Sequence, residues 1–322
     1  MTIPDRSLTS VDDARRARRL SIGAGETWAF GGALAYALTN IFSRIAVVDP
    51  IAAPAFRLIP TLAISWTQVG RSRARWATLS PSAPDFVGWR AISVLFMGGA
   101  LGSTIGTVAF FSALQAGGVV LTAPVLATNI LWSAVIAAVF LKERLSARMV
   151  AGIFVAMLGV ALLGLGRAGS SGSTQAQLTA IPLALITTLS WSASANCSRY
   201  ALTRGVDKYL AIALSQTFGI ALLISILFVL GRGALLWTTP MSAVGVLLLA
   251  GLLSAAAIIC DAHALSLTTV ASALTISLGT NPILSTILAV LFLHEELRPL
   301  MAIGTLLTLA GVVYVQWVKE RN

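Results

Sequence analysis

Two ionisable side chains lie inside long apolar segments, where a charge is costly. Asp261 stands in the run Ile258–Ala264, and Arg57 stands in the apolar segment 51–69. A charged side chain at the centre of a bilayer costs about 2.5–3.5 kcal/mol on insertion scales and usually faces a polar cavity. We therefore expect Asp261 to bind the amine of a solute or to carry a coupling proton, and Arg57 to hold an anionic group such as a carboxylate.

Structural explanations of these residues stay open. Asp261 could reach the interface or an ion-pair partner, and Arg57 could pair with Asp49 or line an outer vestibule. His263 follows Asp261 by two residues, about 200° around a helix, so the two side chains cannot share a face. A titrating His263 is attractive, but a hydrogen-bonded structural histidine is the stronger interpretation.

Two asparagines occupy equivalent places in the two halves of the chain. Asn129 and Asn281 follow or precede the helix-disturbing residues Pro124 and Pro282. Because proline removes a backbone donor and frees a carbonyl, a bent helix there could offer polar groups to a solute. Hydrogen bonding between helices is the alternative, and we favour cavity lining.

Aromatic and amide side chains recur in the first apolar segment of each half. Tyr36 and Asn40 lie in the first of these segments and Trp191 in the second. Aromatic walls suit organic ligands, although packing or lipid-facing rings would explain them equally well. We include all three residues in the candidate binding site.

Motifs for metal, nucleotide or nucleophilic chemistry are missing from the sequence. His294 has no second histidine four residues later, and the glycine-rich run 164–169 ends an apolar segment instead of opening a helix after a strand. Cys197 and Cys260 have no paired spacing that implies a disulfide or a metal. We expect no cofactor, no metal and no enzyme activity, since an embedded enzyme would need converging carboxylates or a histidine cluster.

Two further patterns predict packing. Gly98, Gly102 and Gly106 form overlapping G-x-x-x-G spacings that let another helix approach closely. Glu295 ends an apolar segment, where structural pairing with Arg298 is expected.

The amino-acid composition indicates that the segments which carry these residues lie in lipid. Hydrophobic residues make up 57% of the 322 residues, charged residues only 11%, and the mean hydropathy is +0.87. Soluble domains carry roughly 25% charged residues, so a lipid bilayer is the expected partner. The net charge of +10 sits in short loops between apolar runs, which argues against nucleic acid.

Ten apolar segments are long enough for membrane helices. If the N-terminus is cytoplasmic, most Lys and Arg residues fall inside, and only Arg44, Arg167, Arg232 and Arg298 fall outside. This places both termini in the cytoplasm, after a disordered tail at 1–25 and with a flexible linker at 167–177. The segments are 28–47, 51–69, 89–113, 119–140, 147–166, 178–200, 208–230, 241–266, 271–293 and 299–318.

An internal repeat relates the two halves. Residues 128–145 align with 280–297, and Gly152 and Gly159 align with Gly304 and Gly311. Each half holds five segments, and an odd number inverts the second copy relative to the first. Inverted repeats with a site at their interface are a recurring architecture of carriers.

The repeat carries a family pattern. The first copy contains Phe140-Leu141-Lys142-Glu143-Arg144-Leu145, Gly152 and Leu158-Gly159-Val160, and the second contains Asn281-Pro282, Phe292-Leu293-His294-Glu295-Glu296-Leu297, Gly304 and Ala310-Gly311-Val312. Over residues 28–318 the chain resembles the EamA-type repeat of the drug/metabolite transporter superfamily. Ile130 stands where the family usually has proline, and Tyr36 lies where it has a Trp-Gly pair, which leaves the substrate open. The resemblance implies a ten-helix carrier, often an exporter of amino acids or similar metabolites.

These observations predict an all-α, multi-pass protein of the inner or plasma membrane. Its ten transmembrane helices form two inverted five-helix repeats at 26–166 and 178–319, with both termini cytoplasmic. The expected function is a secondary carrier that exports a small amino-acid-like or drug-like solute by alternating access. Uptake or exchange of a larger solute such as a nucleotide sugar is one alternative, and a non-transporting interaction or sensor protein is another. The pattern does not exclude a homodimer.

Overall fold

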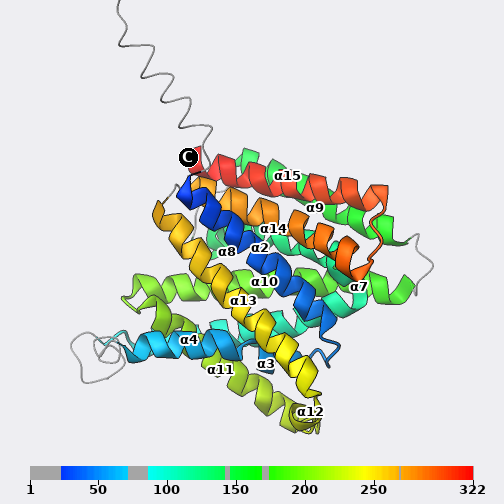
Figure 1. Ribbon diagram of the computed structural model, residues 1–322. Coiled ribbons are helices and arrows are strands. Elements are labelled where there is room, and N and C mark those ends of the chain that lie inside the picture. Colours follow the sequence, from blue (N-terminus) through cyan, green and yellow to red (C-terminus); the bar gives the residue numbers. More distant parts are fainter. Residues whose placement is uncertain (1–22, 72–85, 142–145, 169–173, 268–269, 322) are drawn as a thin grey trace, which may run out of the picture.

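The structure is a computed structural model that describes residues 23–71, 86–141, 146–168, 174–267 and 270–321. These residues form helices joined by short connections, with no strand among the described ranges (Figure 1). The elements are α2 (Ala24–Ile45), α3 (Ala53–Arg57), α4 (Ile59–Gly70), α6 (Trp89–Gly99), the π-helix η1 (Ala100–Gly106), α7 (Thr107–Ala127), α8 (Asn129–Leu141), α9 (Ala147–Ala168), α10 (Thr174–Thr203), α11 (Lys208–Val229), α12 (Leu235–Thr238), α13 (Met241–Leu267), α14 (Val270–Leu293) and α15 (Pro299–Arg321).

Each predicted apolar segment falls on helix where the structure describes it, but several boundaries differ. The second segment divides into α3 and α4 at Leu58, shortly before Pro60, which cannot donate a backbone hydrogen bond. The predicted linker at 167–177 overlaps helix ends, because α9 runs to Ala168 and α10 begins at Thr174. The predicted tail lies largely outside the described residues.

Gly118 interrupts the long helical stretch labelled α7. Its φ of 74° and ψ of 179° are non-helical, and a positive φ is readily accessible only to glycine. Helical backbone resumes at Val119, where the sequence predicts the fourth segment to begin. A second break follows at Thr128, between α7 and α8 and shortly after Pro124.

Glu295, from the other repeat, caps the helix that resumes after the break at Gly118. Its carboxylate accepts hydrogen bonds from the backbone amides of Val119 and Val120, and Arg44 Nε lies 3.6 Å from Glu295 Oε1. The expected pairing of Glu295 with Arg298 is therefore wrong, because Arg298 pairs with Glu296 at 3.6 Å. The unpaired amides at a helix start and the positive end of the helix dipole both favour a carboxylate there.

The first helix of each repeat packs against helices of the other repeat. α2, the first helix of one repeat, contacts α13 and α14 of the other, while α10 contacts α6, η1, α7 and α8. α4 packs against α11, and α9 packs along α15 at one edge of the molecule (Figure 1). Each repeat therefore contributes its first helix to the core of the other.

Glycines bring α9 and α15 into close contact. A Cβ atom at Gly159 would lie 2.6 Å from the carbonyl oxygen of Gly304, and one at Gly311 would lie 2.6 Å from that of Gly152. Since Gly304 and Gly311 are the repeat equivalents of Gly152 and Gly159, the contact has pseudo-two-fold symmetry. The repeated glycines are thus explained by packing.

The contact of α6 and η1 with α10 confirms the predicted G-x-x-x-G packing. A Cβ atom at Gly98 would lie 3.0 Å from Cys197 Cβ, one at Gly102 would lie 2.5 Å from Ser194 Oγ, and one at Gly106 would lie 2.7 Å from Trp191 Cδ1. The glycine stripe therefore decides how closely Trp191 approaches the first repeat.

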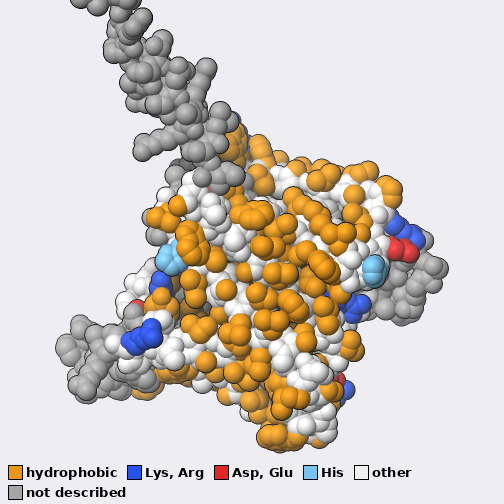
Figure 2. Space-filling view, viewed as in Figure 1, with side chains coloured by type: hydrophobic (Ala, Val, Ile, Leu, Met, Phe, Trp, Pro, Cys, Tyr) orange, Lys and Arg blue, Asp and Glu red, His pale blue; other side chains and the backbone are white. Residues whose placement is uncertain are grey.

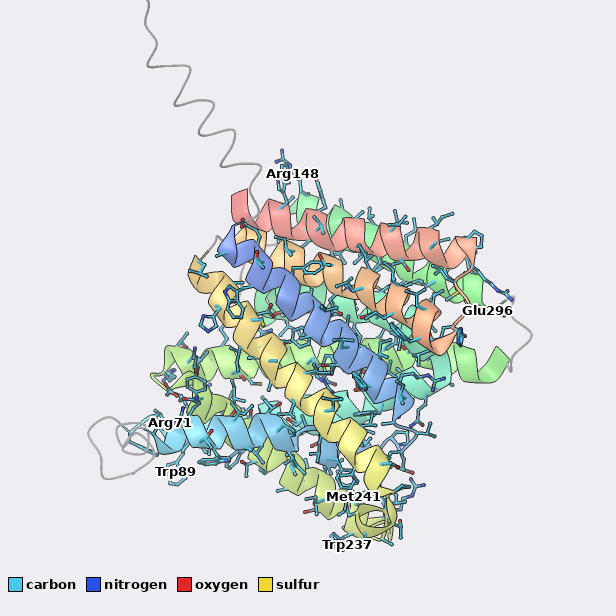
Figure 3. The ribbon with its side chains drawn as sticks, in the orientation of Figure 1. Arg71, Trp89, Arg148, Trp237, Met241 and Glu296 are labelled. Atoms are coloured by element: carbon cyan, nitrogen blue, oxygen red, sulfur yellow. The ribbon has the colours of Figure 1, made fainter. Side chains whose placement is uncertain are left out.

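The outer surface is apolar between two charged ends. Figure 2 shows hydrophobic side chains across the middle of the visible face and charged side chains at its left and right margins. Arg71 and Trp89 lie near one end of the helices and Glu296 near the other (Figure 3). This distribution suits a molecule whose middle contacts lipid.

Only part of the predicted ten-span topology can be read from helix length and apolarity. In the described ranges, the stretches Trp89–Leu126, Lys208–Val229 and Met241–Asp261 are long and apolar enough to cross a membrane. Ala147–Leu163, Gly279–Leu293 and Pro299–Val315 are shorter apolar helices. Ten spans and cytoplasmic termini stay predictions.

Candidate functional site

Arg57 is held at the junction of α3 and α4, close to α13. Its residue is 8% exposed. A Cβ atom at Gly251 on α13 would lie 2.2 Å from the Arg57 carbonyl oxygen, so only glycine allows this approach. The backbone at Arg57 is therefore held by a contact between the two repeats.

The Arg57 guanidinium contacts aromatic rings and not a carboxylate of the described residues. Its Cζ atom lies 4.9 Å from the ring centroid of Phe110 and 5.9 Å from that of Phe111. The Nε atom is buried and has no hydrogen-bond partner among the described residues. Cation–π contacts are worth about 0.5–2 kcal/mol, which offsets only part of the cost of burying a cation in a membrane.

Arg57 does not pair with Asp49, because Asp49 is engaged elsewhere. The Asp49 Oδ2 atom lies 3.2 Å from Arg232 Nη2, and its Oδ1 atom accepts a hydrogen bond from the Ile51 amide at 2.9 Å. Asp49 thus stabilises the loop after α2 and the connection near α12.

Two further predicted residues, Tyr36 and Trp191, lie near Arg57 and its aromatic neighbours. The rings of Phe110 and Trp191 are 5.4 Å apart and tilted by 39°. Tyr36 on α2 is half-buried and lies within electrostatic range of both Arg57 and Asp261. The structure therefore brings Arg57 of α3 and Trp191 of α10 together at Phe110, with Tyr36 of α2 within electrostatic range of Arg57. Phe110 itself was not predicted, since one phenylalanine in an apolar segment carries no distinguishing signal.

Asp261 lies at a different level, between α13, α2 and α14. Its Oδ1 atom accepts a hydrogen bond from Ser277 Oγ at 2.9 Å, and a Cβ atom at Gly32 would lie 2.6 Å from the same oxygen. Ten residues of α13 separate Asp261 from Gly251, which contacts Arg57. At 1.5 Å per residue, the two levels are about 15 Å apart along the helix.

His263 lies at the exposed side of this junction. Its side chain is exposed, and its ring stacks on Trp28 with centroids 5.0 Å apart and an interplanar angle of 29°. Trp28 and Gly32, which approaches Asp261, both belong to α2, so His263 and the partly buried Asp261 contact the same neighbouring helix. This geometry supports the structural interpretation of His263.

Asn40 and Asn281 take part in one hydrogen-bonded chain between α2 and α14. The Asn40 side-chain amide donates to Ser285 Oγ at 3.1 Å, and Ser285 Oγ donates to Asn281 Oδ1 at 3.0 Å. Asn40 is 7% exposed. The chain joins the first helix of one repeat to the proline-containing helix of the other.

A corresponding set joins α10 to α8. Ser192 Oγ donates to the Asn129 carbonyl oxygen at 2.7 Å and also contacts Asn129 Oδ1, and the Asn196 amide donates to Ser133 Oγ at 3.3 Å. Asn129 and Ser133 are the repeat equivalents of Asn281 and Ser285. Asn129 therefore bonds to another helix, whereas Asn281 bonds within α14 to Ser285, which joins that helix to Asn40. Their role as cavity lining stays a prediction.

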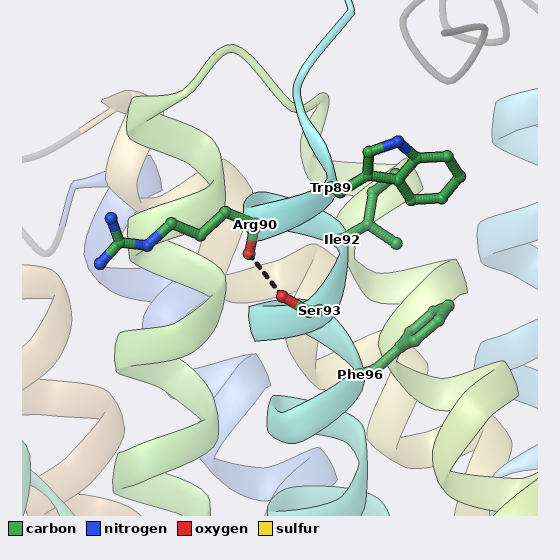
Figure 4. Close-up of a pocket in the computed structure, with 5 residues that line it drawn as sticks. All are labelled: Trp89, Arg90, Ile92, Ser93 and Phe96. Atoms are coloured by element: carbon green, nitrogen blue, oxygen red, sulfur yellow. Dashed lines mark hydrogen bonds between the residues drawn. The ribbon is translucent and has the colours of Figure 1, made fainter.

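A hollow on the surface at α6 offers no comparable site. Trp89, Ile92 and Phe96 point to one side of α6, whereas Arg90 points to the other (Figure 4). Ser93 Oγ donates to the Arg90 carbonyl oxygen at 3.0 Å. Such an arrangement of apolar side chains beside an exposed tryptophan suits contact with lipid near the membrane surface.

Metal ligation has no support in the part of the chain that the structure describes. No group of three or more His, Cys, Asp or Glu side chains there is placed to hold an ion.

Comparisons with known proteins agree with this architecture. The model of the EamA-like transporter family matches the chain twice, at residues 23–165 and 178–317. A solved crystal structure of a protein superposes with a TM-score of 0.57 and 19% sequence identity, over 94% of this chain and 99% of the other. Among curated proteins none matches. Because the family model covers nearly the whole chain in two copies, the protein belongs to the EamA-like transporter family of the drug/metabolite transporter superfamily.

Proposed function

We propose that the chain is a secondary carrier that exports a small organic solute across the cell membrane by alternating access. Membership of a transporter family supports the general class. The observation that carries the proposal is the unpaired Arg57 guanidinium, buried against Phe110 at the contact between the two repeats. A buried cation without an acid is expensive, and a solute that binds there would offset that cost.

The packing of each first helix against the other repeat supports alternating access. Because α2 packs into the second repeat and α10 into the first, the repeats can exchange their conformations around a shared site. Opening on one side then closes the other. The polar chains around Asn40 and Asn196 lie at corresponding contacts, where small rearrangements between helices would be needed.

A carrier for nucleotide sugars would need more cationic groups than the site offers. In the described residues, the other Lys and Arg side chains lie in loops or near helix ends. One guanidinium beside aromatic rings favours a smaller amino-acid-like or drug-like solute. A non-transporting sensor would bind a solute without moving it, so a flux assay separates the two functions.

Vesicle uptake tests the function and its direction. Inverted and right-side-out membrane vesicles would be prepared from cells that express the chain, and labelled amino acids and amphiphilic cations would be screened. Export predicts saturable accumulation in inverted vesicles above vesicles without the protein. Accumulation only in right-side-out vesicles would contradict export, and binding without accumulation in either would contradict a carrier. Arg232→Gln, at the Asp49 pair outside the site, is a matched control that should keep the flux.

A further inference from the structure

We infer that Arg57 binds a carboxylate, so that the transported solute is a carboxylate with an apolar, preferably aromatic, group next to it. This inference rests on the proposed function and specifies the chemistry of its substrate. Three observations lead to it: the missing counter-ion, the single cation and the aromatic rings nearby.

The chain supplies no counter-ion of its own in the part that the structure describes. Asp49 pairs with Arg232, Glu295 with Arg44, and Asp261 accepts from Ser277. Arg57 makes no hydrogen bond or ion pair with a described residue, and its buried Nε atom has no partner. An arginine that lies against ring faces and makes no hydrogen bond is a donor fork without an acceptor, which an external anion would satisfy.

The charge at the site favours a carboxylate over a phosphate. Arg57 is the only described Lys or Arg side chain in contact with Phe110, and the other described cations lie in loops or near helix ends. One guanidinium matches a monoanion, and its planar fork fits a carboxylate bidentately. A phosphate dianion would bring one charge too many into a low-dielectric site.

The rings beside Arg57 indicate what the carboxylate is attached to. Phe110 lies between the guanidinium and Trp191, at 4.9 Å from the Arg57 Cζ atom and 5.4 Å from the Trp191 ring centroid. Phe110 is fully buried and Trp191 is half-buried. A solute with its carboxylate on Arg57 would place its next atoms along this aromatic wall, where ring contacts favour an apolar or aromatic group.

Asp261 lies at a different level of α13 from Gly251, the residue that contacts the Arg57 backbone. The two levels are about 15 Å apart along the helix. A role of Asp261 in carrying a proton is a separate prediction, tested by its own variant. The carboxylate preference does not depend on Asp261.

Binding of probes that share one phenyl ring tests this inference. Phenylacetate, phenethylamine and phenyl phosphate would be titrated into the detergent-purified full chain, with tryptophan fluorescence and thermal stabilisation as readouts. We expect phenylacetate to bind at least about tenfold more tightly than phenethylamine. Arg57→Gln should weaken phenylacetate roughly 10- to 100-fold, as expected for a lost charge-assisted hydrogen bond, and leave phenethylamine unchanged. Arg232→Gln should change neither.

The outcomes that overturn the inference are distinct from those that overturn transport. Equal binding of phenylacetate and phenethylamine, tighter binding of phenyl phosphate, or full phenylacetate affinity in Arg57→Gln would each overturn the carboxylate assignment. If Arg57→Gln does not fold, the order of the three probe affinities in the unmodified chain still tests the inference. Binding is measured without vesicles. Carboxylate binding by a protein that shows no flux would therefore support the carboxylate site at Arg57 and overturn the proposed carrier. Flux without a carboxylate preference would support the carrier and overturn the carboxylate site.

Discussion

The carboxylate of Glu295 caps the helix that resumes at Val119 in the other repeat. Its two oxygens accept from the Val119 and Val120 amides at 3.0 and 2.9 Å. A negative charge is favourable at a helix start, where amides have no acceptor within the helix. Gly118 makes room for this cap, because a Cβ atom there would lie 2.6 Å from both carboxylate oxygens.

Replacing Glu295 should destabilise the contact between the repeats. Glu295→Ala leaves two amides and Arg44 without their acceptor, and we expect the free energy of unfolding to fall by about 1.5–3 kcal/mol. Glu296→Ala is the matched control, since its side chain is 71% exposed and its loss should be within about 0.5 kcal/mol. Thermal unfolding in detergent measures both. Equal melting temperatures for the two variants would show that the Glu295 cap does not stabilise the protein.

The glycine contact between α9 and α15 should not tolerate a methyl group. In Gly159→Ala the new Cβ atom would lie 2.4 Å from the Thr308 amide and hydroxyl, and overpacking of this kind typically costs about 1–3 kcal/mol. At Gly245 on α13 a Cβ atom meets nothing within 4 Å, so Gly245→Ala should be neutral or stabilising by up to about 1 kcal/mol. Denaturant or thermal unfolding would separate them. A stable Gly159→Ala variant would mean that α9 and α15 are not in this close contact.

Kinetics of two asparagine variants can decide between cavity lining and helix-to-helix bonding. If Asn40 and Asn196 serve only to join helices, Asn40→Ala and Asn196→Ala should each lower the free energy of unfolding by about 0.5–1.5 kcal/mol and leave the KM of flux unchanged. If they line the path of the solute, KM should rise several-fold. We expect the first result, because both amides already donate to Ser285 or Ser133. A raised KM with unchanged stability would contradict it.

Asp261→Asn should separate proton coupling from substrate binding. The variant keeps an oxygen that can accept from Ser277 but loses the titrating carboxylate. We expect flux driven by a proton gradient to fall at least tenfold, while exchange of solute without a gradient continues. The measurement is vesicle flux with and without an imposed pH difference. Gradient-driven flux that is unaffected by the substitution would assign Asp261 to structure alone.

Part of this organisation could be predicted from the sequence. The cost of a charge in an apolar segment identified Arg57 and Asp261, and the residues held in register identified the repeat. The position of the break at Gly118 also agreed with the predicted start of the fourth segment. These are local or periodic signals, which a single sequence retains.

Partners across the repeats could not be predicted. Glu295 and Val120 are 175 residues apart, and an isolated glutamate at the end of an apolar segment does not reveal which helix start it caps. Phe110 carries the aromatic contact of Arg57 but resembles every other apolar residue in its segment. α10 lies in the core although it contains the polar residues Thr187, Thr188 and Ser192, which are buried. The apolarity of its sequence therefore does not predict its central position.

Exchange across the membrane tests the central claim most directly. A phenyl-ring carboxylate that binds the purified chain would be loaded, unlabelled, into proteoliposomes, and entry of the labelled compound would be followed from outside. Alternating access predicts saturable entry that is faster with unlabelled solute inside than without it, and none above background in protein-free vesicles. Entry that does not saturate and ignores the internal solute would contradict a carrier, as would a complete lack of entry with folded protein that binds the same compound.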